Sequence, residues 1–118
     1  MKAIEKFDNV IAQGREVIDE SINYTVFRAY RIGLKTKNDT IDFGEVIWNQ
    51  DVEGVVETLR EFGFESFTIS NTASGMTELV AEFLKHGCKL AGMTVVKTQY
   101  EDWMTGKLNT APAFVIEL

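Results

Sequence analysis

The spacing of apolar and polar positions predicts helices alternating with strands along most of the chain. The clearest helix spans residues 51–62, where the apolar side chains recur at helical spacing: Val52, Val55, Val56, Leu59 and Phe62. Asp51 or Asn49 can cap its start, and Gly63 can take the left-handed position beyond its end. A second amphipathic helix follows Gly75 with the stripe Met76, Leu79, Val80, Phe83 and Leu84, and Gly87 ends it in the same way.

Two further helices are predicted nearer the N-terminus. The first carries Ile4, Phe7, Ile11 and Ile18 at helical spacing. Residues 22–34 are ambiguous, because their aromatic and β-branched types favour a strand while Ile22, Val26, Phe27, Tyr30, Gly33 and Leu34 form one helical stripe. A helix is preferred, because it gathers Arg28, Arg31 and Lys35 on a solvated side.

Three longer segments have the composition of strands: "FESFTIS" from residue 64, "KLAGMTVVKTQY" from residue 89 and "PAFVIEL" from residue 112. Residues 40–48 can add a short strand. Residues 64–97 then form one right-handed βαβ unit, and the last two strands form an antiparallel hairpin. The expected fold is α/β (or α+β), with N-terminal helices packed on a small mixed sheet, in a single globular domain over residues 1–118.

The last strand is apolar at residues 113–116, so both of its faces call for burial. We expect it to be central in the sheet, with Pro112 as its first residue because proline has no N–H to donate. If no strand of the same chain, such as residues 40–48, pairs with its free edge, that edge is open to a second copy of the protein.

Charge and composition argue against several classes of function. The chain of 118 residues has 12 Lys and Arg against 18 Asp and Glu, a net charge of −6, which is unlike the basic face of a nucleic-acid-binding protein. No apolar run approaches a membrane span, and the N-terminal segment has no apolar signal core. With one cysteine, Cys88, no internal disulfide can form, and a cytoplasmic location is expected.

The stretch "SNTASG" is the preferred place for a site. It follows a strand and opens a helix, whose unpaired N–H groups and partial positive charge attract a small anion. Its residues are Ser70, Asn71, Thr72, Ala73, Ser74 and Gly75. Parallel strands would bring Trp48, Tyr100 and Trp103 to the same rim. The same residues are also ordinary helix caps, with Ser74 or Thr72 as the expected N-cap, and this use alone explains them as well.

Little in the sequence points to catalysis, a metal or a cofactor. His86, the only histidine, lies at the far end of its helix, so a Ser-His or Cys-His arrangement with Ser70 or Cys88 is not expected. Neither His nor Cys shows the spacing of a zinc site. Asp39 and Asp42, or Glu101 and Asp102, can act as acid/base pairs, although a solvated face is the commoner role of carboxylates.

The motifs "DFGEVIW", "FTIS", "GCKLAGM" and "PAFVIEL" resemble those of a family of small uncharacterised bacterial proteins. The resemblance is carried by Asp42, Phe43, Trp48, residues 67–70, Ser74, Gly87 and residues 113–114. It implies no reaction or cofactor, and it is in keeping with a bacterial cytoplasmic accessory protein.

Three functions are therefore considered. The favoured one is a non-enzymatic interaction or regulatory module that binds a protein partner or a second copy of itself. The alternative is a domain that binds a small anionic ligand at Ser70–Gly75. The third is an enzyme that uses carboxylates at the same rim.

Overall fold

The computed structural model describes residues 23–45, 47–70 and 75–118, together with residues 5, 8, 9 and 12. The helix predicted from Ile4 to Ile18 falls mostly outside these residues. In the described part of the chain from residue 23 on, three α-helices, one 3₁₀-helix and four strands follow one another: α3 (Tyr24–Thr36), β1 (Asp42–Phe43), η1 (Asn49–Asp51), α4 (Val52–Glu61), β2 (Ser66–Ile69), α5 (Met76–Lys85), β3 (Lys89–Glu101) and β4 (Leu108–Glu117).

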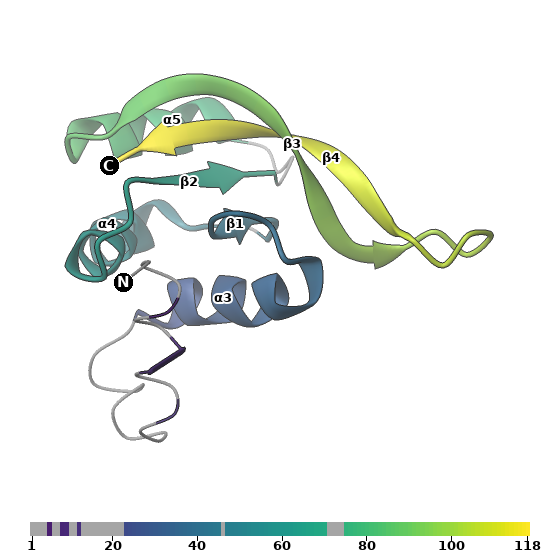
Figure 1. Cartoon of the computed structure of the whole chain (residues 1–118). Helices are drawn as coiled ribbons and strands as arrows, with labels where there is room; N and C mark the ends of the chain where they lie inside the picture. The colour runs from purple at the N-terminus through teal and green to yellow at the C-terminus, as the bar shows by residue number, and fades with distance from the viewer. Residues whose placement is uncertain (1–4, 6–7, 10–11, 13–22, 46, 71–74) are drawn as a thin grey trace.

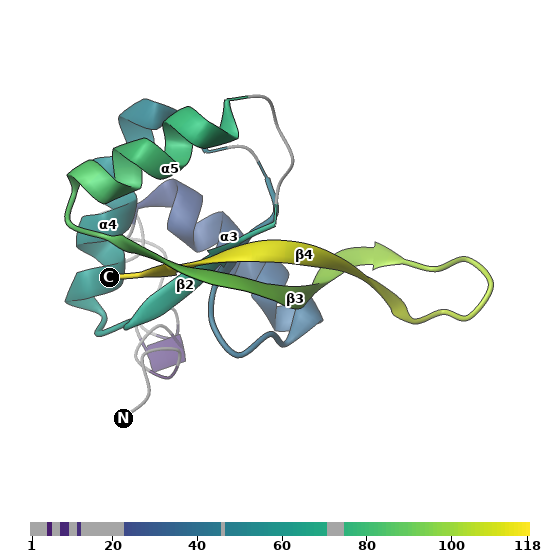
Figure 2. The same ribbon diagram turned by 90° about the horizontal axis from the view of Figure 1, so that it is seen from above.

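The strands form one mixed sheet in the order β1-β2-β4-β3. β1 and β2 are parallel, whereas β4 is antiparallel to both β2 and β3. The three α-helices pack on this sheet, which makes the predicted α+β class correct (Figures 1 and 2). β3 and β4 continue beyond the end of β2 as a two-stranded arm that leaves the body of the molecule (Figure 1).

The core lies between the sheet and the stripes predicted for α4 and α5. All four apolar α4 positions, Val52, Val55, Val56 and Leu59, are buried, and Gly63 has the expected positive φ of 81°. In α5, Leu79 and Phe83 are buried and Gly87 has a φ of 85°, but Leu84 is 45% exposed. The stripe of α5 is therefore narrower than predicted, because the sheet meets only one side of this helix.

Residues 24–36 form a helix, as preferred from the sequence. The Asn23 side chain caps its start by accepting hydrogen bonds from the N–H groups of Thr25 and Val26. Its basic residues are exposed as expected: Arg28, Arg31 and Lys35. The buried stripe differs from the predicted one, since Ala29 replaces Leu34, which is 58% exposed.

The predicted βαβ unit is present in a split form. β2 and β3 are parallel to each other and joined through α5, but β4 lies between them and pairs with both. A second unit, β1-α4-β2, joins two neighbouring parallel strands. The central position predicted for the last strand is confirmed, although its second partner is β2 and not residues 40–48.

The prediction that Pro112 begins the last strand is wrong, because β4 starts four residues earlier, at Leu108. Pro112 lies opposite Val95 of β3 and beyond the last pair of the β2 ladder, which joins Ile69 to Phe114. The missing N–H of Pro112 has no energetic cost there, because neither neighbouring strand has an acceptor for it at this position.

In the described part of the chain, the helices are too short or too polar to cross a membrane.

Candidate functional site

A cleft of about 260 Å³ opens where β1 and β2 end. Its floor comes from the two parallel strands, one wall from the second half of α3, and the other wall from β3 and β4. The lining residues are Ile32, Gly33, Thr36, Asp42, Gly44, Ser70, Lys97, Thr98, Gln99, Tyr100 and Ala111. The ends of parallel strands are the usual position of ligands in such sheets.

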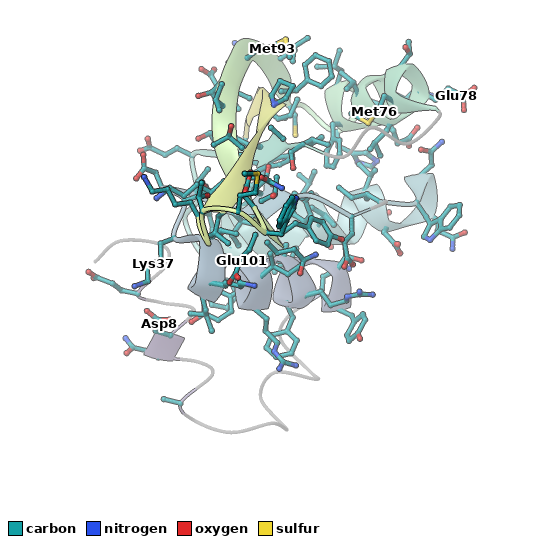
Figure 3. The ribbon with its side chains drawn as sticks, turned by 90° about the vertical axis from the view of Figure 1, so that its right-hand side faces the viewer. Asp8, Lys37, Met76, Glu78, Met93 and Glu101 are labelled. Carbon is teal, nitrogen blue, oxygen red and sulfur yellow. The ribbon has the colours of Figure 1, made fainter. Side chains whose placement is uncertain are left out.

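Two contacts hold the arm over α3 and so keep the cleft walls in place. The Asn38 side chain donates to the Lys97 carbonyl at 2.9 Å and accepts from the Lys97 N–H at 3.0 Å. Further along the arm, Lys35 of α3 forms an ion pair of 3.8 Å with Glu101, which lies in front of α3 in Figure 3. The side chains of this pair are more than half exposed, so we expect the Asn38 contact to contribute more to the position of the arm.

The polar centre of the cleft is the Asp42 carboxylate. Thr68 Oγ1 donates to Asp42 Oδ1, and Ser70 Oγ donates to Asp42 Oδ2, both at 2.6 Å. These three side chains are brought together because Asp42 lies beside Thr68 in the parallel β1–β2 ladder. Asp42 is half-buried, so the solvated role given to this carboxylate from the sequence is wrong, while Asp39 is exposed as expected.

Burial raises the pKa of Asp42 above its ordinary value, against the opposing effect of the hydrogen bonds from Ser70 and Thr68. The folded protein therefore binds the Asp42 proton more tightly than the unfolded chain does. The corresponding stability is fully present below the unfolded pKa and is lost as the pH rises through the folded pKa.

We expect Asp42→Asn to unfold at an equal or higher denaturant concentration than the wild type at pH 7, because asparagine carries no charge to bury. The advantage should disappear near pH 3, where Asp42 is protonated. Urea unfolding at the two pH values measures this difference. The contrary result is a loss of stability in Asp42→Asn that is larger at pH 7 than at pH 3. It would show that the ionised carboxylate stabilises the fold.

Of the residues predicted to share a rim, Ser70 and Tyr100 line this cleft together. Trp48 lines an adjacent cleft with Arg28 and Asp51, and it is 65% exposed. Gly75 lies at the start of α5, beside a groove that also meets Ser70. Trp103 is 90% exposed in the turn between β3 and β4, away from the rim. Asn71, Thr72 and Ser74 lie outside the described residues.

The predicted capping of α5 by Ser74 or Thr72 falls on residues outside the described part of the chain and stays a prediction. The described helix begins after Gly75, which occupies the N-cap position with a φ of 87°. Anion binding at Ser70–Gly75 remains a prediction. At Ser70 itself the neighbouring charge works against it, because the hydroxyl already donates to a carboxylate.

The outer strand β3 is the second feature with functional potential. Many of its apolar side chains are exposed: Leu90 at 47%, Met93 at 63%, Val95 at 67% and Tyr100 at 65%. Met93 lines the same groove as Met76 and Glu78 of α5. These three side chains are labelled in Figure 3. At the tip, Asp102 accepts from the N–H groups of Met104 and Thr105, which fixes a turn that displays Trp103.

Among the described residues, no strand pairs with the outer side of β3, and its backbone is open there over a short segment. Both backbone groups of Lys97 face away from β4, since they bind Asn38. Backbone direction alternates along a strand, and β3 keeps an unbroken register with β4 from Gly92 to Lys97. The N–H and C=O groups of Val95 and Met93 therefore also face outward, and Pro112 opposite Val95 fits this arrangement.

Sequence reasoning missed both Asp42 as the centre of a cleft and β3 as the outer strand. A signal for Asp42 was available, because an acidic residue flanked by Ile41 and Phe43 is an unusual choice for a short buried strand. The run "AGMTVVKT" offers no comparable signal for an outer strand, since its composition suits an internal strand equally well.

Comparison with known families identifies one family. A family model described as a domain of unknown function, DUF7698, matches residues 25–118. The chain belongs to this family. The match begins inside α3 and includes the whole sheet, the Asp42 cleft and the β3–β4 arm. No curated protein and no solved structure matches the chain.

Proposed function

We propose that this DUF7698 protein is a non-enzymatic interaction module that associates with a second copy of itself through the outer edge of β3. The observation that carries the proposal is the open segment Met93–Val95, where outward-facing backbone groups coincide with exposed apolar side chains. An open apolar edge is a template for another strand.

Antiparallel pairing around a two-fold axis at Thr94 uses this segment fully. Met93 then lies opposite Val95 of the second copy, and Val95 lies opposite Met93, so all the outward backbone groups of the two residues are paired. The side chains of Met93 and Val95 share one face of the sheet. Each pair would therefore form an apolar contact across the new strand boundary.

The distribution of charge supports a second copy at this strand. The whole chain carries a net charge of −6, which makes most of its surface repel another molecule of the same kind. β3 is different, because it contains Lys89 and Lys97 and has no acidic residue before Glu101. The register centred on Thr94 places Lys97 opposite Ala91 and Lys89 opposite Gln99, so no like charges meet.

Val95→Pro tests the proposal, because it removes only an N–H that the monomer does not use and because Pro112 already occupies the opposite position. In light scattering after size exclusion, the wild type should shift towards twice the monomer mass as its concentration rises. Val95→Pro should stay at the monomer mass with an unchanged circular dichroism spectrum. Val95→Thr, which keeps the N–H and the strand preference, is the matched control and should dimerise.

Met93→Lys provides a second test that does not change the backbone, because a charge at this position opposes edge pairing. A wild type that stays monomeric at high micromolar concentration would refute the proposal. So would dimers of Val95→Pro and Met93→Lys as strong as those of the wild type.

A further inference from the structure

The proposed self-association through the edge of β3 does not involve the Asp42 cleft. Its carboxylate lies at the ends of two neighbouring parallel strands, while Met93 and Val95 lie on another part of β3. The two features are independent, because none of the residues that line the cleft belongs to the open segment of the β3 edge.

Asp42 retains the capacity to bind a ligand. An ionised carboxylate offers about four acceptor positions, and Thr68 and Ser70 occupy one on each oxygen. Among the described residues no cation forms an ion pair with Asp42, and Lys97, which also lines the cleft, is tied to the α3–β1 loop by its backbone. Among these residues, the half-buried carboxylate therefore has no cation within ion-pair distance, although Lys97 lines the same cleft.

Gly44 leaves the approach to this carboxylate open. A Cβ atom at this position would lie 3.4 Å from Ser70 Oγ and 3.7 Å from Asp42 Oδ2. These are ordinary contact distances, so alanine would fit, but a larger side chain would extend over the two oxygens. The φ of Gly44 is not in the left-handed region. The backbone conformation therefore does not require a glycine at position 44, whereas open access to the Asp42 carboxylate does.

The remaining walls suit a short apolar body. Ile32, Ala111 and Tyr100 supply apolar surface, and Gln99 and Thr98 supply polar groups near the rim. The volume of 260 Å³ equals that of about nine water molecules in the liquid, at roughly 30 Å³ for each molecule. We propose that the Asp42 cleft binds a small organic cation, an alkyl amine or alkyl guanidine, whose N–H groups donate to the Asp42 carboxylate.

The test uses two probes of the same shape, butylguanidine, which is a cation, and butylurea, which is neutral. Each is titrated into ¹⁵N-labelled protein, and the amide signals are followed. Butylguanidine should cause saturable shifts at Gly44, Ser70 and Tyr100 and should bind about tenfold more tightly than butylurea, since a charged donor strengthens the hydrogen bond. In Asp42→Asn this preference should disappear.

Gly44→Val is the second variant, because it covers the mouth of the cleft and leaves the carboxylate in place. It should lose butylguanidine binding while keeping the dispersed spectrum of a folded protein. The proposal is overturned if butylguanidine shifts no cleft amide, or if either variant binds it as the wild type does. Inorganic phosphate that binds at Ser70 in its place would likewise overturn it and would support the anionic alternative.

Discussion

Replacing Phe83 with alanine is expected to lower the free energy of unfolding by about 3–5 kcal/mol, which is enough to unfold a domain of ordinary stability. Phe83 is fully buried, and its ring centroid lies 5.0 Å from that of Phe67. Phe67 in turn meets Phe43 edge to face at 5.4 Å. The three rings join α5, β2 and β1, so the cavity left by Phe83 would weaken the contact between helix and sheet.

Urea unfolding followed by circular dichroism measures this loss. Leu84→Ala is the matched control, because Leu84 follows Phe83 in the same helix and is 45% exposed. Its cost should stay below about 1 kcal/mol, apart from the small difference in helix propensity. Equal costs for the two variants would contradict the packing of α5 on the sheet.

Removing residues 114–118 is expected to abolish cooperative folding. This segment supplies every β4 residue that pairs with β2, and the same four residues, 114–117, also pair with β3. It contains Ile116, which is fully buried, and Leu118, whose N–H donates to the Glu65 carbonyl. Without it, β2 would lose its β4 partner and β3 would keep only its pairing with residues 108–113, so the sheet would separate into two pieces.

Circular dichroism and the dispersion of the proton spectrum give the result for the truncated chain. The control is a chain in which Trp103 and the rest of the turn 102–107 are replaced by Asn-Gly, a two-residue hairpin turn. That chain should stay folded, because the turn contacts solvent. A truncated chain that keeps its fold and loses only its oligomeric state would place β4 at an interface and not in the core.

The sequence predicts most of the helices and strands because their patterns are local. In α4, the Val52–Leu59 stripe and Gly63 each mark the element independently. The order of strands is a different matter, because β4 enters between β2 and β3 through contacts that are distant along the chain. Nothing in residues 64–97 signals that their two strands are separated by a third.

The candidate site could be predicted in part. Parallel strands brought Ser70 and Tyr100 to one cleft, as the topology required. Trp103 was misplaced because β3 runs on for 13 residues and carries the turn beyond the rim. Asp42 was undervalued because its burial depends on α3 and the arm, and the hold of Asn38 on Lys97 has no signature in the sequence.

The most direct test of the central claim is an isotope-filtered nuclear Overhauser experiment on a mixture of ¹³C-labelled and unlabelled protein. In the proposed dimer, Thr94 lies opposite Thr94 of the second copy in a non-hydrogen-bonded pair, where the Cα atoms are about 4.5 Å apart. We predict a cross-peak between the Hα atoms of the two Thr94 residues that grows with concentration and is absent in Val95→Pro. Intermolecular cross-peaks that arise only from other surfaces, such as Trp103 at the tip of the arm, would contradict pairing through the β3 edge.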